Sequence, residues 1–224
     1  MHKGTTAFCN IAFLKACSRY PIAIDWNLLI FSPGEAQSTY EKYMRDIPLL
    51  AHLPPPAGVF PVNFVRHSDY LRNREAYGLD LKPHDFYGLT FPFSESSIAN
   101  IAEHFVDCRA DIERVDYWLD TLNNSVRRWK ERWMSADGKP QARLCLLEGD
   151  GGWSIYDSRS GNVKEYDIGP RTAQVLRILN QPTSIQELRT KLGDIAANDL
   201  SKEMSFIRKR GLAFEENGRY LALA

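Results

Sequence analysis

The feature that most constrains the fold is a strand that turns directly into a helix. Residues 22–31 are almost all apolar and β-favouring, as in a strand covered on both faces. Ser32 stands three residues before Glu35, with Pro33 next to it, a pattern that predicts a capping box at the start of a helix over residues 34–47. Enzymes of the α/β class place ligands at such turns, although an ordinary connection between a strand and a helix has the same pattern.

The order of the first elements predicts a parallel sheet. A helix over residues 5–19 precedes the strand, and a strand-like run over residues 59–65 follows the second helix. Alternation of this kind places parallel strands side by side, with helices crossing between them. Residues 66–96 are rich in aromatic side chains and prolines without a period. They are expected to form a long loop, either folded onto the core or clamping a substrate.

A long run of apolar residues dominates the middle of the chain. From Ile98 to Trp133 the apolar positions recur at spacings of three and four, which predicts one long amphipathic helix. The helix is expected to be a strut packed across the rest of the protein, or one strand of a dimeric coiled coil. The sequence therefore divides into a region of residues 1–96, a connector helix of residues 97–137 and a C-terminal domain of residues 138–224.

The C-terminal domain has the pattern of a winged helix. Three helices are followed by a hairpin over residues 214–223, where Asn217 and Gly218 suit a type I′ turn. The second of these helices is expected to open at Thr183 and Ser184. Strands are expected before the helices, at residues 143–148, 153–157 and 163–168.

Charge argues against nucleic acid and membranes as partners. The 28 basic and 28 acidic residues cancel, so the chain has no overall basic character. The third C-terminal helix begins with Asp199, Leu200 and Ser201, where a recognition helix would contact bases, so DNA binding is a minor alternative. No apolar run approaches the length of a transmembrane helix and no secretory segment opens the chain, so a cytoplasmic protein is expected.

No catalytic or metal-binding motif is visible. The nucleophile elbow, the phosphate-binding loop and the dinucleotide fingerprint are all missing from the sequence, and no catalytic residue is assigned. The four cysteines form no C-x-x-C pair and have no histidine at ligand spacing, so free, buried thiols are expected and no metal site. The four cysteines are Cys9, Cys17, Cys108 and Cys145.

Six short segments occur in an order that one family shares. They are Lys3-Gly4-Thr5-Thr6, Trp26-Asn27-Leu28-Leu29, Ser32-Pro33-Gly34-Glu35, His52-Leu53-Pro54-Pro55-Pro56, Arg66-His67-Ser68-Asp69-Tyr70 and Arg219-Tyr220-Leu221-Ala222-Leu223-Ala224. In this order they resemble the C-terminal half of cobalamin-dependent radical S-adenosylmethionine (SAM) proteins that mature ribosomally made peptide natural products. The resemblance covers essentially the whole chain.

The resemblance implies an α/β fold that combines an incomplete (β/α) barrel, the long amphipathic helix and a winged-helix-like α+β domain. It implies a cobalamin domain and a C-x-x-x-C-x-x-C motif that holds an iron–sulfur cluster. The cluster cleaves SAM to a radical that abstracts hydrogen from a precursor peptide, and C-methylation often follows. This chain has neither the motif nor a cobalamin domain. Both cofactors are therefore expected in an N-terminal half, which a separate gene can encode. Without that half this chain is expected to be inactive, and to aggregate or to need a partner.

The resemblance also implies site residues. The turn Phe31, Ser32, Pro33, Gly34 and Glu35 matches a barrel loop beside SAM, and Arg66 and Tyr70 match the peptide-facing end of the last strand. Two departures weaken the match. Phe31 stands where the family usually has glycine, and His67-Ser68-Asp69 stands where it has Phe-Ser-Pro. The alternative functions are a non-catalytic module that binds the precursor peptide and, as a lesser possibility, a winged-helix DNA-binding protein.

Overall fold

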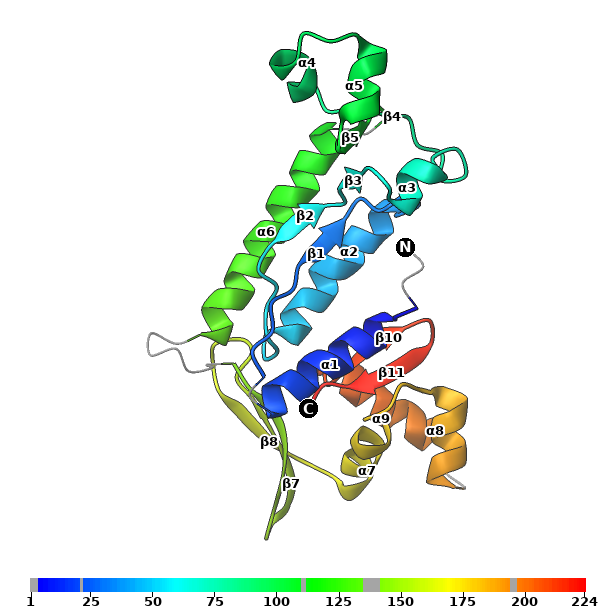
Figure 1. Ribbon diagram of the computed structural model, residues 1–224. Helices are drawn as coiled ribbons and strands as arrows, with labels where there is room; N and C mark the ends of the chain where they lie inside the picture. Colours follow the sequence, from blue (N-terminus) through cyan, green and yellow to red (C-terminus); the bar gives the residue numbers. More distant parts are fainter. Residues whose placement is uncertain (1–3, 21, 110–111, 135–141, 194–196) are drawn as a thin grey trace. The chain divides into compact units, whose positions relative to one another are not determined.

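The computed structural model describes all residues except 1–3, 21, 110–111, 135–141 and 194–196 (Figure 1). The chain is a mixed α/β protein, and in the described part its strands form four small sheets, none of them closed into a barrel. Contacts group the chain into two compact units. Unit 1 comprises Asn27–Glu41 and Ala57–Asn124, and unit 2 comprises His2–Trp26, Lys42–Pro56 and Ser125–Ala224.

A parallel pair of strands lies in unit 1. Strand β1 (Leu28–Ile30) pairs in parallel with β2 (Val59–Pro61), and helix α2 (Gln37–Asp46) lies between them in the sequence (Figure 1). The predicted parallel arrangement of the first two strands is confirmed. The strands are shorter than expected because, within the described residues, each pairs with only one neighbour over three residues.

The rest of unit 1 is built around an antiparallel sheet. Its strands are β3 (Phe64–Val65), β5 (His104–Asp107) and β4 (Leu81–Pro83), in that spatial order. The same unit contains three short helices, α3 (Asp69–Arg72), α4 (Phe86–Thr90) and α5 (Glu95–Ile101). The prediction of a long loop over residues 66–96 was therefore wrong. Tyr70 and Tyr87 of this stretch belong to a small core, whereas Phe86, Phe91 and Phe93 are exposed. The buried residues of this core are Phe64, Tyr70, Leu81, Tyr87, Ile98, Ala102 and Phe105.

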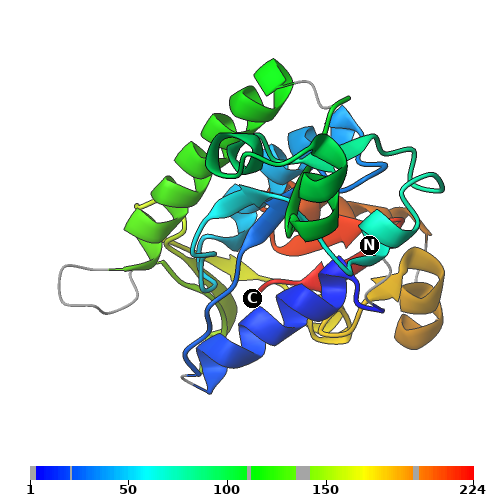
Figure 2. The ribbon, with the colours of Figure 1, turned by 45° about the horizontal axis from the view of Figure 1, so that its top comes forward.

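The prediction of one continuous helix from Ile98 to Trp133 was also wrong. Helix α5 ends before Ala102, which is extended, and β5 intervenes before α6 (Ile112–Trp133) begins (Figure 2). Ile98 and Phe105 fit the apolar period, but one side chain comes from a helix and the other from a strand of the same core. Inside α6 the predicted apolar positions Leu122, Val126 and Trp129 are buried. Trp118, which was not among the predicted positions, is buried in place of its neighbour Leu119, which is half-buried.

Unit 2 begins with a capped helix and contains an antiparallel meander. Helix α1 (Ala7–Arg19) is capped by Thr6, whose hydroxyl accepts a hydrogen bond from the Cys9 amide at 3.2 Å. A short 3₁₀ turn, η1 (Ile47–Leu50), follows α2. The meander is β6 (Leu144–Gly149), β7 (Gly152–Asp157) and β8 (Lys164–Ile168), which confirms the three strands expected there.

The last part of unit 2 has the elements that the sequence predicts. The Ser184 hydroxyl and the Glu187 carboxylate form a capping box at the start of the second helix. Asn217 and Gly218 have φ values of 50° and 70°, as a type I′ turn requires. The elements are α7 (Pro170–Ile178), β9 (Thr183–Ser184), α8 (Ile185–Leu192), α9 (Ala197–Lys209), β10 (Ala213–Glu216) and β11 (Arg219–Ala222), and the sheet has the order β10-β11-β9.

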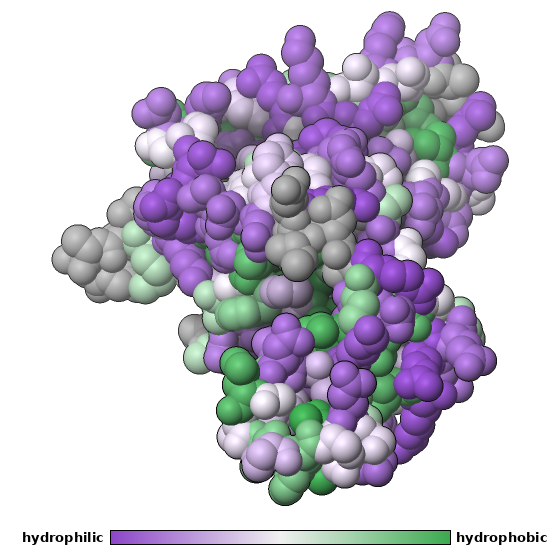
Figure 3. All heavy atoms as spheres, turned by 90° about the horizontal axis from the view of Figure 1, so that it is seen from above, coloured by the Kyte–Doolittle hydropathy of each residue, from purple (hydrophilic) through white to green (hydrophobic). Residues whose placement is uncertain are grey.

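Surface and length bear on where such a chain can reside. Among the described helices, none combines the length and the apolar character needed to cross a membrane. The face drawn in Figure 3 carries hydrophobic residues in separate groups among hydrophilic ones.

Candidate functional site

The turn after β1 is a tight reverse turn rather than the first turn of a helix. The Glu35 amide donates to the Ser32 carbonyl at 3.0 Å, and Gly34 has a φ of 87°. Proline at the second position and glycine with positive φ at the third are the marks of a type II turn. Helix α2 therefore begins only at Gln37, and the predicted helix start at residue 34 was wrong. One contact of the predicted capping box does form, because the Glu35 carboxylate accepts from the Ser32 amide at 3.2 Å.

Tyr40 fixes this turn from the first turn of α2. Its side chain is fully buried, and its hydroxyl donates to Oε2 of Glu35 at 2.9 Å while accepting from the Phe31 amide at 3.1 Å. Burial, and then the negative charge of Glu35, raise the pKa of Tyr40 well above its usual range. The hydroxyl therefore stays protonated, and it holds both ends of the turn in place.

Phe31 occupies a backbone conformation that favours glycine. Its φ is 60°, in the left-handed region, and its ring packs on that of Tyr40 with the centroids 5.0 Å apart. A side chain in this region costs about 1–2 kcal/mol relative to the right-handed region. The position where the resembled family usually has glycine is thus one where the backbone itself favours glycine.

Tyr70 comes from a different segment and lies at the same turn. It is on helix α3, which Ser68 caps, and the residue is only 8% exposed. Its hydroxyl is buried without a hydrogen bond of ordinary geometry. Burial and then the Glu35 charge raise the pKa of Tyr70, and the neighbouring Ser32 side chain acts in the opposite direction. The fold therefore brings together Tyr70 and the turn, which the sequence predicts separately as peptide-binding and SAM-binding.

Two backbone amides at the turn are free. The N–H groups of Gly34 and Ala36 donate no hydrogen bond within the described residues. They lie just before α2, where the positive end of the helix dipole favours a negatively charged group. With the Glu35 carboxylate and the Tyr70 hydroxyl, the turn offers donors for an anion and acceptors for a cation.

Arg66, predicted to face the peptide, lies at the end of helix α5, and its substrate role stays a prediction. Its Nε donates to the Ala102 carbonyl, and a terminal nitrogen donates to the Ala99 carbonyl, both at 2.6 Å. Its guanidinium also lies 5.6 Å from the ring centroid of Phe105. Carbonyls at a helix C-terminus are natural partners for a cation. Arg66 therefore caps α5, and these contacts provide no support for the substrate role.

The cysteines offer no metal site in the described part of the chain. No group of three or more histidine, cysteine, aspartate or glutamate side chains there is placed to hold a metal ion. All four cysteines are free, as expected, but Cys9 and Cys108 are exposed rather than buried.

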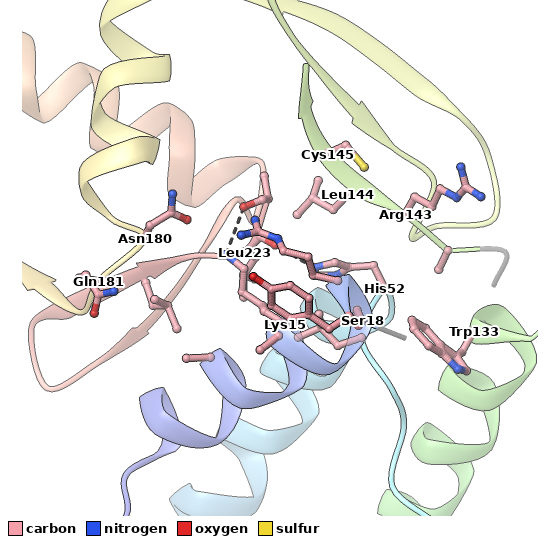
Figure 4. Close-up of a pocket in the computed structure, with 18 residues that line it drawn as sticks. Lys15, Ser18, His52, Trp133, Arg143, Leu144, Cys145, Asn180, Gln181 and Leu223 are labelled. Carbon is pink, nitrogen blue, oxygen red and sulfur yellow. Dashed lines mark hydrogen bonds between the residues drawn. The ribbon is translucent and has the colours of Figure 1, made fainter. Parts of the chain in front are cut away.

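A pocket in unit 2 has no counterpart in the sequence predictions. His52 is buried at its edge, and because a carbonyl only accepts, its Nε2 donates to the Leu223 carbonyl at 3.0 Å (Figure 4). Burial above all lowers the pKa of His52 to about 4. Lys15 donates to the carbonyls of Ala222 and Ala224, and burial lowers its pKa to about 8. These residues are far apart in the sequence and share no motif.

No family model, curated protein or solved structure matches this chain. The resemblance to radical SAM proteins therefore depends on the six short sequence segments alone. The residues around Glu35 are the part of the structure where this resemblance can be tested.

Proposed function

We propose that this chain is part of a cytoplasmic radical SAM protein that modifies, by C-methylation, a ribosomally made precursor peptide. The supporting observation is the meeting of Tyr70 with the turn from Phe31 to Glu35 at the carboxyl end of β1. Ligands of α/β proteins bind outside the carboxyl ends of parallel strands, and β1 and β2 are such a pair. The parallel pair with α2 between its strands fits one repeat of a (β/α) barrel.

The turn can hold SAM through complementary charges. The free amides of Gly34 and Ala36 suit the carboxylate of its methionyl group, and Glu35 suits the amino group or the sulfonium. Tyr70 supplies a hydroxyl for a hydrogen bond that the protein itself does not satisfy. The iron–sulfur cluster and cobalamin that supply the radical and the methyl group are assigned to no residue of this chain.

The test is SAM cleavage in the assembled system. The chain is purified together with the polypeptide that carries the C-x-x-x-C-x-x-C motif, fused or separate, and 5′-deoxyadenosine formation is followed. Tyr70→Phe is expected to lower cleavage about tenfold, since one hydrogen bond to a charged ligand has about that value. Tyr77→Phe, a tyrosine of the same segment that bonds Asp69 instead, is the matched control. Cluster-dependent cleavage that does not need this chain would refute the proposal.

A second function, binding of the precursor peptide, has its own support in unit 2. Strand β8 lies at an edge of the meander, and its Tyr166 ring contacts Phe206 of α9 at a centroid distance of 6.2 Å. An open edge beside a helix can accept an extended peptide as an added strand. The element order from α7 to β11, with β11 between β9 and β10, also supports the winged-helix assignment.

Hydrogen exchange distinguishes this binding mode. Adding a precursor peptide should slow exchange of β8 amides, because a new strand bonds those that face away from β7. The other edge strand, β6, provides an internal control and should keep its exchange rates. Peptide binding without protection between Lys164 and Ile168 would exclude strand addition at β8, and no binding would exclude the peptide-binding function.

A further inference from the structure

The pocket in unit 2 is large enough for a small molecule. It has a volume of about 700 Å³ and is formed by α1, β6, β11 and the segments around His52 and Asn180 (Figure 4). Ligand sites in proteins commonly measure about 300–1,000 Å³ and combine apolar walls with a few polar groups. Nothing in the proposed SAM or peptide sites uses this pocket.

The charged side chains among the described residues of the wall are cationic, and His52, whose pKa burial lowers, stays neutral. Lys15, Arg19 and Arg143 line the pocket, and none of the other described lining residues is an aspartate or a glutamate. Lys15 is held by two backbone carbonyls, so Arg19 and Arg143 are the two cations without such partners. Lys15 is half-buried whereas Arg19 and Arg143 are exposed, and like charges gathered around one hollow attract an anion.

The two guanidinium groups are free to bind a ligand. Neither the Arg19 nor the Arg143 side chain forms a hydrogen bond or an ion pair with the described residues, whereas the buried Arg159 of the same unit uses its whole guanidinium on protein groups. Lys15 uses two of its three donors on carbonyls, which leaves one N–H. Arginine binds carboxylates in a bidentate manner, and such bonds are among the strongest in proteins.

The remaining wall is largely apolar. Leucine side chains and the Trp133 ring provide that surface, and the Asn180 and Gln181 side chains lie near the end of α7 (Figure 4). The apolar lining residues include Leu53, Leu144, Leu221 and Leu223. A fully hydrated inorganic anion would leave this surface uncovered, whereas an acid with a hydrocarbon body would bury it.

We propose that this pocket binds a small organic carboxylate with an apolar body, whose acid group pairs with Arg143 and Arg19 and whose hydrocarbon lies against the leucines. Binding at this site is separate from SAM cleavage and from precursor-peptide binding.

Cys145 provides the readout, because it lines the pocket and is partly buried. The full chain is treated with iodoacetamide, a neutral reagent, and alkylation of each cysteine is followed by mass spectrometry. Saturating hexanoate should slow alkylation of Cys145 severalfold and leave the exposed Cys9 and Cys108 unchanged. Hexylamine, of the same length and opposite charge, and inorganic phosphate should give no protection.

The charge-removing variants complete the test. In Arg19→Gln/Arg143→Gln, the hexanoate concentration for half protection should rise at least about tenfold, the loss expected for charge-assisted hydrogen bonds. Arg189→Gln, an exposed arginine of α8 outside the pocket, is the matched control and should behave as the unmodified chain. The proposal is overturned if hexanoate gives no protection, if hexylamine or phosphate protects equally, or if the double variant keeps full protection.

Discussion

Two tyrosine hydroxyls near Glu35 differ in whether the protein satisfies them. Tyr40 gives one hydrogen bond and accepts another, whereas Tyr70 is buried without a hydrogen bond of ordinary geometry, with the Ser32 side chain beside it. Tyr40→Phe leaves the Phe31 amide without its partner and should lower the free energy of unfolding by about 2 kcal/mol. Tyr70→Phe removes an unsatisfied group and should leave stability unchanged or slightly higher. Urea unfolding of both variants measures this, and an equal loss would contradict the assignment.

Phe31 allows backbone strain to be separated from packing. Phe31→Ala loses the ring contact with Tyr40 but keeps a Cβ at a φ of 60°, and Phe31→Gly loses the same contact and relieves the strain. The glycine variant should therefore be the more stable of the two by about 1 kcal/mol. Thermal or urea unfolding of the pair gives this difference directly. An alanine variant as stable as the glycine variant would show that the turn carries no such strain.

His52 should make unit 2 sensitive to acid. Its pKa is lowered from 6.5 to about 4 in the folded chain, so between these values the unfolded state binds more protons. Stability must then fall as the pH falls from 6.5 to 4, by up to about 3 kcal/mol from this group. His52→Gln can keep the bond to the Leu223 carbonyl without titrating, and its stability should depend less on pH in this range. His84→Gln, at an exposed histidine, should keep the steeper dependence.

At the scale of elements, one arginine connects three segments of unit 2. Arg159 is buried, forms an ion pair with Asp157 and donates to the carbonyls of Leu49, Arg210 and Gly211. Arg159→Lys keeps the charge but cannot form this fork of bonds, so it should lower the free energy of unfolding by about 3 kcal/mol. Arg189→Lys, at an exposed arginine of α8, should change it by less than about 0.5 kcal/mol. Similar effects of the two substitutions would contradict the structural role of Arg159.

Elements that local chemistry specifies were predicted well. The helix start at Ser184 and the Asn217-Gly218 turn each depend on contacts between residues close in sequence. The long helix was mispredicted because a spacing of three and four also fits a helix followed by a strand, when both face one core. The helix start at residue 34 was mispredicted because the Pro-Gly pair favours a type II turn over a helix.

The site was only partly predictable, because some of its residues are brought together by tertiary packing and not by their order in the sequence. The turn from Phe31 to Glu35 follows from its own residues, but Tyr40 and Tyr70 reach it through tertiary packing. Arg66 has residue chemistry that suits either a substrate or a helix end, and only the folded chain shows it bound to the carbonyls of α5. Pocket residues such as Lys15 and Cys145 lie more than a hundred residues apart, so no sequence window contains both.

At the scale of the whole molecule, the two units are not successive domains. Helices α2 and α6 each contribute residues to both, since the unit boundaries fall after Glu41 and after Asn124, inside these helices. A change that unwinds either helix should therefore destabilise both units. The boundaries predicted near residues 97 and 138 describe changes in sequence pattern, and they remain predictions of how the chain is organised.

The parallel pair in unit 1 should promote self-association. In the described residues its sheet has only two strands, so each has an unpaired edge, and the aligned Leu29 and Phe60 are 36% and 49% exposed. Open edges and apolar side chains together favour pairing between molecules. Sedimentation velocity should show concentration-dependent association that Phe60→Lys weakens, because a charge blocks edge pairing. Leu89→Lys, which changes a more exposed residue of helix α4, should leave association unchanged. A protein that is monomeric at all concentrations, or equal effects of the two substitutions, would show that this sheet does not mediate contacts between molecules.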